Sequence, residues 1–159
     1  MKLPKARLSR RIVLWVFASV IIIETIIFIP SYNNRKEELL DQLKMISWAR
    51  VSTILQGMSA NTPIQTFVDR IERLENFENI IGGAIYGSDG KKLTSFGDRP
   101  KLTADDIHAE GQFSYLLDKN YRYDIGCSFG YSGEKYALVL RNNAASVKKE
   151  LTAFMLRIA

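Results

Sequence analysis

The hydrophobic pattern begins with one long apolar run, Ile12–Ile29, whose eighteen residues include a single charged side chain, Glu24. As a helix rising about 1.5 Å per residue, this run measures roughly 27 Å, close to the hydrocarbon thickness of a bilayer. A soluble core helix would show a polar face, whereas here only Ser19, Glu24 and Thr25 are polar. A cleaved export signal has a shorter run followed by small residues, and neither feature is present. We therefore predict a retained transmembrane helix over residues 12–30.

The residues before this run predict its orientation. Residues 1–11 carry five basic side chains and no acidic one. Basic flanks tend to stay in the cytoplasm, so residues 1–11 are expected to form a cytoplasmic tail. The chain beyond Pro30 is then expected outside the inner (cytoplasmic) membrane, in the periplasm, with a single crossing in the sequence as given.

Glu24 is the unusual residue of the apolar run. It lies about 18 Å along the helix from Ile12, in the outer half of the span. A charged side chain at mid-span costs about 2.5–3.5 kcal/mol on insertion scales, and less near the interface. One interpretation is a polar contact with another helix inside a receptor bundle, and the other is a carboxyl tolerated close to the outer headgroups.

A second helical pattern follows Pro30, a residue that cannot donate to the helical ladder and so kinks or restarts the helix. Apolar or small residues then recur at spacings of three and four: Leu40, Leu43, Ser47, Val51, Ile54 and Met58. Such a stripe is typical of a coiled-coil seam or of a core-facing helix. It predicts either a stalk that joins two chains in a homodimer or a helix packed on its own domain. One helix can do both, with its first turns dimeric and its last turns intramolecular.

The rest of the chain predicts an α+β domain with an antiparallel sheet. Thr62, Pro63 and Gln65 are expected to begin a helix as the N-cap, first turn and capping box. Five strands are expected at 80–86, 92–96, 112–117, 121–129 and 136–141, and Asp89-Gly90 supplies the turn of the first hairpin. Residues 31–142 would form this domain with its helical stalk. Residues 143–159 would form a membrane-proximal helix.

The net charge of +5 belongs to the N-terminal tail, because 17 basic and 17 acidic residues follow Arg11. The domain therefore lacks the basic block that tracks nucleic-acid phosphates. We expect no nucleic-acid partner.

Few residues offer catalytic or metal chemistry. With one cysteine, Cys127, and one histidine, His108, the chain has neither an intrachain disulfide nor a site built on several such ligands. The glycines of residues 82–87 match no phosphate-binding motif and indicate a bulge or close packing instead. Asp105-Asp106 fit a helix start. His108 is a possible pH sensor, although a surface residue without a role is the simpler interpretation. We expect no cofactor, no metal and no enzymatic activity.

Two segments carry a resemblance to a known group. A long helix, a second helix, then IIGGAIYGSDGKKLTSFG and three more strands resemble the extracytoplasmic PAS-like sensor domains of bacterial receptors, of the PDC or Cache type. The N-terminal LSRRIVLWVFASVIIIETIIFIPSYNNRKEELL looks like the start of membrane-bound sensor histidine kinases and nucleotide cyclases, notably cyanobacterial ones. The resemblance implies a second membrane helix after residue 159 and a cytoplasmic output module.

The resemblance also implies a ligand pocket between the sheet and the helices that cover it. Residues on the predicted central strands are its candidates: Tyr86, Tyr115, Tyr121, Tyr123 and Phe129 as lining, with Arg122, Asp124 and Arg141 as polar contacts. Apolar linings with a few polar groups are usual for ligand pockets, but ordinary packing explains each residue as well. The tyrosine, arginine and Trp-Tyr motif of the group's amino-acid sensors is absent, which argues against an amino acid as the ligand.

These observations predict a membrane-anchored sensory domain of a bacterial signal-transduction receptor. An unknown small ligand, or a change in dimer packing, would shift the helices that flank the domain. The alternative is a membrane-anchored scaffold subunit that binds another protein and no small ligand.

Overall fold

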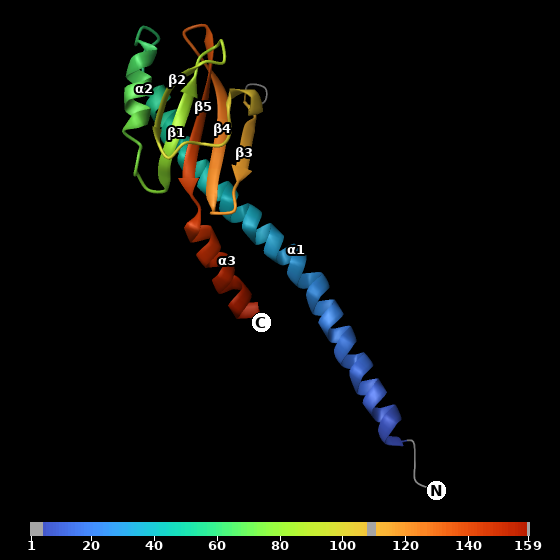
Figure 1. Cartoon of the computed structure of the whole chain (residues 1–159). Coiled ribbons are helices and arrows are strands. Elements are labelled where there is room, and N and C mark those ends of the chain that lie inside the picture. The colour runs from blue at the N-terminus through green and yellow to red at the C-terminus, as the bar shows by residue number, and fades with distance from the viewer. Residues whose placement is uncertain (1–4, 108–110, 159) are drawn as a thin grey trace.

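The computed structural model describes residues 5–107 and 111–158 of the chain (Figure 1). It confirms the predicted α+β class. The elements in order are α1 (Lys5–Gln56), α2 (Ile64–Glu72), β1 (Ile80–Tyr86), β2 (Lys92–Gly97), the short 3-10 helix η1 (Ala104–Asp106), β3 (Phe113–Leu117), β4 (Arg122–Tyr131), β5 (Glu134–Asn143) and α3 (Ala145–Ile158).

The five strands form one antiparallel sheet in the order β2-β1-β5-β4-β3. The last strand, β5, therefore lies in the middle, between β1 and β4. The strands of the β4–β5 hairpin are longer than the sequence predicts, because pairing continues to Tyr131 and Glu134 across a tight turn. Ser132 and Gly133 make this turn with positive φ angles of 50° and 78°.

Helix α1 is a single helix of 52 residues that extends far beyond the sheet (Figure 1). Of the two outcomes expected at Pro30, a kink or a restart, the restart does not occur, since helical structure continues through this residue. Proline is tolerated in such helices when nearby hydroxyl groups bond to the backbone. The Ser31 hydroxyl donates to the Ile27 carbonyl at 2.8 Å, one position beyond the carbonyl that Pro30 leaves without an amide partner.

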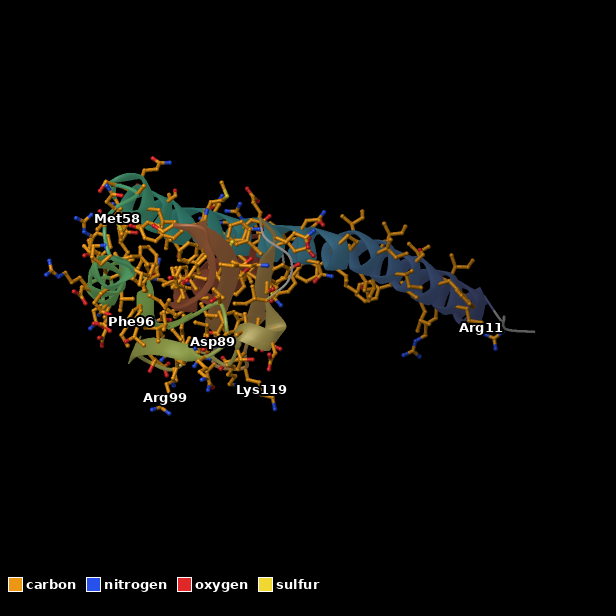
Figure 2. The ribbon with its side chains drawn as sticks, turned by 90° about the horizontal axis from the view of Figure 1, so that it is seen from above. Arg11, Met58, Asp89, Phe96, Arg99 and Lys119 are labelled. Atoms are coloured by element: carbon orange, nitrogen blue, oxygen red, sulfur yellow. The ribbon has the colours of Figure 1, made fainter. Side chains whose placement is uncertain are left out.

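The apolar half of α1 projects from the domain without contacts to the sheet (Figures 1 and 2). It is the one helix of the described chain that is long and apolar enough to cross a membrane, and its most apolar window is not buried at all. Trp15 is 75% exposed and Ile26 is 65% exposed. This exposure excludes the interpretation of the run as a core helix, because exposed large side chains on this scale need an apolar partner.

The second half of α1 packs against one face of the sheet. Its stripe of Leu39, Leu43, Ser47 and Val51 is buried. Val51 joins a core with Phe67, Val68 and Ile71 of α2 and with side chains of β1, β2, β4 and β5. The predicted stripe therefore serves the domain's own core, which was the second interpretation of the pattern.

The N-cap prediction for α2 is wrong. Pro63 occupies the N-cap position and makes no side-chain capping bond. The Thr62 hydroxyl is instead bonded to that of Ser59 at 2.9 Å, and the Gln65 amide donates to Asp69 at 2.9 Å. Local side-chain partners have replaced the expected capping box.

Close packing explains the glycine pair of β1. A Cβ at Gly82 would lie 2.1 Å from the backbone oxygen of Asp98, and one at Gly83 would lie 2.7 Å from the ring of Phe96. The register of β1 against β5 also shifts between Ile80 and Gly82. Both glycines thus admit neighbouring atoms that a side chain would exclude.

The other face of the sheet is covered by the segment from Asp98 to Ile107, where Leu102 is buried. Viewed from above, α1 lies on one side of the domain, while Asp89, Arg99 and Lys119 lie on the opposite side (Figure 2). We call these two faces of the sheet the helix face and the loop face.

Helix α3 follows β5 directly and returns along α1 (Figure 1). Its buried Val147 and Leu151 form a second core with Leu39 and Leu43 of α1 and with Tyr123 and Ile125 of β4. Arg35 and Glu150 link the two helices with an ion pair of 3.5 Å. Both helices therefore leave the sheet at the same end.

Candidate functional site

The pleat of the sheet divides the predicted ligand residues between the two faces. Tyr123 and Phe129 pack in cores that include α1, so they belong to the helix face. Alternation along a strand then places Arg122, Asp124 and Ser128 on the loop face. Arg141 pairs with Asp124 across the sheet and therefore shares the loop face. Tyr86 shares it too, because it pairs with Ala137, which is the partner of Ser128. The structure does not bring the aromatic and polar candidates together in one pocket.

On the helix face, the aromatic candidates pack against other side chains. Phe129 lies 5.1 Å from Phe67 and 5.9 Å from Tyr136, measured between ring centroids. Tyr123 is 2% exposed. Burial, with smaller contributions from Asp41 and Tyr115, raises the pKa of its phenol to about 12. These rings form the core.

The remaining aromatic candidates lie at the edges of the domain. Tyr115 is 65% exposed, with its ring 6.4 Å from that of Tyr123. Tyr121 packs beside Tyr32 of α1 and under the ammonium of Lys148 of α3. Tyr86 is half-buried on the loop face, where burial, and then the charge of Asp106, raise its pKa.

The loop face holds a buried ion pair between Asp124 and Arg141, on neighbouring strands. The Arg141 Nε and Nη2 atoms donate to the two Asp124 oxygens at 2.7 Å and 3.1 Å. The Asp124 carboxylate also accepts the backbone N–H groups of Lys101 and Leu102 at 2.5 Å and 3.2 Å. Asp124 is fully buried. Hydrogen bonding to Asp124 raises the pKa of Arg141.

This pair extends into a network that holds the covering segment. The Asp98 carboxylate forms ion pairs with Arg141 and with Arg122, each at 3.6 Å. Lys101 pairs with Asp118 at 3.1 Å. Asp124 and Arg141 thus bind each other, and all three polar candidates, Arg122 included, bind the segment 98–102. They attach this segment to the sheet.

A small pocket lies on the loop face, near the β1–β2 turn. Its volume is about 220 Å³, and it is lined by Gly87, Ser88, Gly90, Ala104, Ile107, Ser128, Lys135, Tyr136 and Ala137. Ser128 is 5% exposed, and its hydroxyl has no hydrogen-bond partner within the described part of the chain. Of the sequence candidates, none lines this pocket.

A buried polar contact joins α1 to the strand that leads into α3. The Ser47 hydroxyl donates to the Asn142 side-chain oxygen at 2.8 Å, and both residues are buried. The Asn143 side-chain oxygen then accepts the N–H of Ala145 at 3.0 Å and so caps the start of α3. The end of β5 is therefore fixed to α1 on one side and begins α3 on the other.

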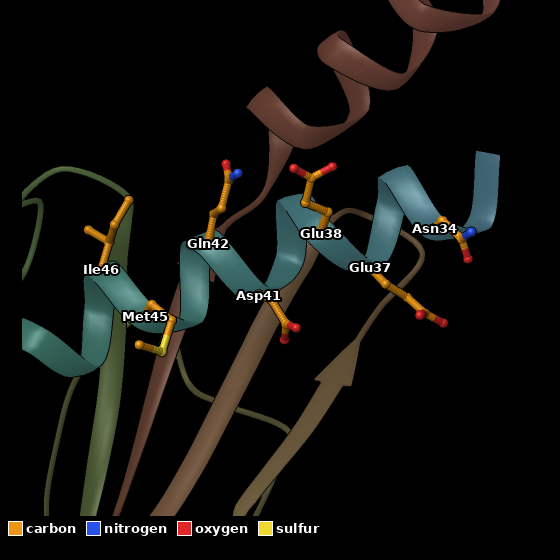
Figure 3. Close-up of a pocket in the computed structure, with 7 residues that line it drawn as sticks. All are labelled: Asn34, Glu37, Glu38, Asp41, Gln42, Met45 and Ile46. Carbon is orange, nitrogen blue, oxygen red and sulfur yellow. The ribbon is translucent and has the colours of Figure 1, made fainter. Parts of the chain in front are cut away.

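Further hollows lie along α1. An open groove on its solvent-exposed face is lined by Asn34, Glu37, Glu38, Asp41, Gln42, Met45 and Ile46 (Figure 3). A second hollow of about 400 Å³ lies between α1 and the end of α3, where Ile158 meets Glu24, Thr25 and Phe28. The predicted intramembrane acid thus lines a groove shared by both helices.

Other residues named from the sequence contribute to local structure or to packing. Asp106 accepts the N–H and hydroxyl of Thr103 at 2.8 Å and 3.0 Å, so it caps η1. These bonds, the backbone one first, lower its pKa. Cys127 is buried. His108 lies outside the described residues. Within residues 5–107 and 111–158, no three His, Cys, Asp or Glu side chains gather to hold a metal ion.

Sequence reasoning missed Ser128, Lys135 and the Ser47–Asn142 contact. Each is a common residue type that matches no motif. The residues that surround each of them come from distant parts of the sequence. The alternation of β4 does place Ser128 on the face opposite the aromatic core, which was the available signal.

Comparisons with protein-family models, curated proteins and solved structures give no match.

Proposed function

We propose that the protein is the membrane-anchored, extracytoplasmic sensory domain of a bacterial signal-transduction receptor. The observation that supports it most is the connection of the central strand β5 to both helices. Ser47 binds Asn142 at 2.8 Å, and α3 begins at Ala145, two residues after β5 ends. A change in the sheet that moves β5 would therefore be passed to both α1 and α3.

Anchoring by residues 12–30 agrees with the exposure of this segment. In the proposed arrangement the basic tail lies in the cytoplasm and the sheet lies outside. Helix α3 then approaches the membrane beside α1, because Ile158 shares a groove with Glu24 and Thr25. A relative displacement of about 1–2 Å is the usual scale for helix shifts that carry a signal.

The proposal includes a homodimer through α1. The core-facing stripe of α1 is occupied by its own sheet, so the second copy would contact the exposed side, where Met45 is 64% and Ile46 is 49% exposed (Figure 3). Nearer the membrane this side carries Glu37, Glu38 and Asp41. Like charges would face each other there, which confines close contact to the turns around Met45.

Glu24 is proposed as the polar contact of the membrane segment. It lines the groove between α1 and α3, in the outer half of the span. A carboxyl in this position is stabilised by a polar partner or by protonation, so its groove is suited to a further helix.

One observation favours the alternative of a scaffold subunit. Asp124 and Arg141 satisfy one another and the covering segment, which leaves these strong polar groups unavailable to a small ligand. In that case the domain would bind another protein through its surface.

A ligand screen with a distance readout tests the proposal. The full chain in nanodiscs, with Cys127→Ser, would carry spin labels at Gln42→Cys and Lys149→Cys, one on each flanking helix. If the protein is a sensor, some metabolite of a small-molecule panel will raise the melting temperature and shift the α1–α3 distance distribution. A panel without effect, together with a partner protein that co-purifies at fixed stoichiometry, would support the scaffold instead.

A further inference from the structure

The sheet ends in two edge strands, β2 and β3, which differ in how they are protected. Strand β2 carries Lys92 and lies beside α2, where the Thr94 hydroxyl donates to Glu72 at 2.5 Å. Strand β3 has the sequence Phe-Ser-Tyr-Leu-Leu, without a charge or a proline. Among the described strands, none pairs with its outer side (Figure 1). Charges, prolines and covering elements usually keep an edge strand from pairing with another chain, so β3 is the less protected edge.

The register with β4 shows which backbone groups of β3 point outward. The Asp118 N–H donates to the Arg122 carbonyl at 2.9 Å, just beyond the paired residues of the hairpin. Bonded pairs alternate with non-bonded pairs along an antiparallel ladder, so Leu116 and Ser114 direct their backbone groups to β4. The other three residues of the strand direct their N–H and C=O groups to the outer side: Phe113, Tyr115 and Leu117. We call this outer side of β3 the docking edge.

The side chains at the docking edge are partly exposed and uncharged. Tyr115 is 65% exposed and Leu116 is 39% exposed. Tyr115 pairs with Ile125 and so lies on the helix face, while Leu116 pairs with Asp124 and so lies on the loop face. An added strand would meet an aromatic side chain on one face and an aliphatic one on the other. Cross-strand pairs of this kind stabilise a sheet.

A second copy of the chain does not suit the docking edge. Strands β3 and β5 are both antiparallel to β4, so β3 runs toward the end from which α1 and α3 leave the sheet (Figure 1). Antiparallel pairing of two β3 strands would place the apolar α1 segments of the two copies at opposite ends of the joined sheet. Two copies anchored in one membrane cannot adopt this arrangement, and parallel pairing is less stable per residue.

A positive charge lies at the end of the docking edge. Lys119 follows β3 by two residues, in the turn to β4, and is exposed (Figure 2). Within the described chain its ammonium group forms no ion pair, whereas that of Lys101 pairs with Asp118 at 3.1 Å. A segment antiparallel to β3 would begin beside this turn. An acidic residue at the start of that segment would therefore lie close to Lys119.

We propose that β3 binds an extended segment of another protein, which joins the sheet antiparallel to β3. The segment has apolar residues at alternate positions, facing Tyr115 and its neighbours, and an acidic residue at its N-terminal end, facing Lys119. Main-chain hydrogen bonds supply affinity in such strand addition, and alternate side chains supply specificity. The docking edge adds a protein partner to the proposed sensory domain. It rests on the proposed function only for the shared membrane that excludes a second copy.

Two synthetic peptides test the docking edge without any change in the protein. Both have the sequence acetyl-Asp-Val-Thr-Phe-Thr-Val-Thr-amide, which would place its phenylalanine opposite Tyr115. The probe peptide carries N-methyl groups on its threonines, so that it cannot aggregate and keeps the N–H groups that face β3. The control peptide carries them on its valines and phenylalanine, which blocks those N–H groups. Each is titrated calorimetrically into the full chain in nanodiscs, and into empty nanodiscs.

We expect saturable binding of the probe peptide and at least about tenfold weaker binding of the control peptide, because the control lacks three hydrogen-bond donors. Absence of saturable binding of the probe, or equal binding of the two peptides, would overturn the proposal.

Variants of the chain identify the edge that is used. Tyr115→Pro removes an outward N–H, a change that edge strands tolerate, and Tyr115→Ala is its control for the lost ring. We expect the probe peptide to bind about fivefold more weakly to Tyr115→Pro than to Tyr115→Ala. Lys119→Gln should weaken binding about two- to fivefold, as for an exposed ion pair. Leu93→Ala, at an exposed apolar residue of β2, should leave the affinity unchanged.

Equal affinities for Tyr115→Pro and Tyr115→Ala would contradict the assignment to β3, as would a loss of binding in Leu93→Ala. Self-association of the chain in detergent that Tyr115→Pro abolishes would assign the edge to a second copy instead. The peptide pair and Lys119→Gln remain decisive even if Tyr115→Pro fails to fold.

The metabolite screen on the α1–α3 distance fails independently of this test. Probe binding in a chain whose α1–α3 distance responds to no metabolite would keep the docking edge and contradict the sensory function. A metabolite response without probe binding would support the sensory function and contradict the docking edge.

Discussion

Asp124 is the residue on which the loop face depends most. Its carboxylate satisfies Arg141 and two backbone N–H groups at once while fully buried. Removing one partner of a buried ion pair costs about 3–5 kcal/mol, and here it would leave Arg141 only the longer contact with Asp98 at 3.6 Å. We therefore expect Asp124→Ala to lower the free energy of unfolding by an amount in this range.

Urea unfolding of the full chain in micelles measures this loss. Trp48 is a suitable probe, because it contacts Phe113 of β3 at 5.3 Å and so reports the α1–sheet interface. Trp15 would be replaced by phenylalanine to isolate the signal. The matched control is Asp105→Ala, an exposed acid that should change stability by less than about 0.5 kcal/mol. Equal effects of the two variants would refute the role given to Asp124.

The environment of Asp118 leads us to expect that the free energy of unfolding falls at acidic pH. Its carboxylate accepts the N–H groups of Asn120 and Arg122 at 2.8 Å and 3.0 Å and pairs with Lys101. The backbone bond from Arg122 is the main cause that lowers its pKa from 3.8 to about 2. A depressed folded-state pKa stabilises the fold above the unfolded value, and this contribution is lost as the pH falls through the folded value.

The difference in urea midpoint between the unmodified chain and Asp118→Asn should therefore be present at pH 5 and disappear as the pH falls from about 4 to about 2. Comparing the two proteins cancels the titration of the other carboxylates. A difference that is constant over this range would show that Asp118 contributes no pH-linked stability.

At the residue scale, the sequence predicts the face of each β4 residue but not its partner. Alternation separates Tyr123, Ile125 and Phe129 from Asp124 and Ser128, and the structure confirms this division. The pairing of Asp124 with Arg141 depends on the register between β4 and β5. Local pattern contains no information on that register beyond the hairpin turn.

Among the elements, the contact between α1 and the end of β5 is the one through which the proposed signal would pass from the sheet to the helices. Ser47 and Asn142 are both buried and bond at 2.8 Å. A double-mutant cycle with Ser47→Ala and Asn142→Ala should give a coupling energy of about 1 kcal/mol, the usual net value of such a bond. Asn142→Ala alone should also broaden the α1–α3 distance distribution.

The cycle is measured by the same urea titration, with Ser52→Ala and Asn142→Ala as a control pair, because Ser52 lies on α1 outside this contact. Additivity of the Ser47 and Asn142 variants to within about 0.3 kcal/mol would mean that the two side chains do not stabilise each other.

Strong local signals explain which elements the sequence predicts well. The Asp-Gly turn and flanking apolar runs predict the first hairpin at residues 80–86 and 92–96, and the structure has β1 and β2 there. The start of α2 was mispredicted because Thr62 finds a partner in Ser59. The sequence left two outcomes open at Pro30, a kinked but continuous helix or a restart, since a proline signal indicates a lost hydrogen bond but not whether the surrounding helix tolerates it. The structure has the continuous helix.

For the whole molecule, the arrangement of the two helices is more informative than the sheet. Helices cover one face of the sheet and the segment 98–107 covers the other. The residues that were expected to form one pocket are divided between these two faces. Both α1 and α3 leave from the same end (Figure 1). The exposed apolar segment of α1 lies beyond that end, which places the membrane there in the proposed arrangement.

The measurement that tests this account most directly is the sidedness of the chain before and after the apolar segment of residues 12–30. In a Cys127→Ser background, Arg10→Cys and Ser88→Cys would be labelled in intact cells with a membrane-impermeant maleimide. The account predicts that Ser88→Cys reacts in intact cells and that Arg10→Cys reacts only after the membrane is permeabilised. Equal reactivity of both positions in intact cells, or a mature protein without its first thirty residues, would contradict it.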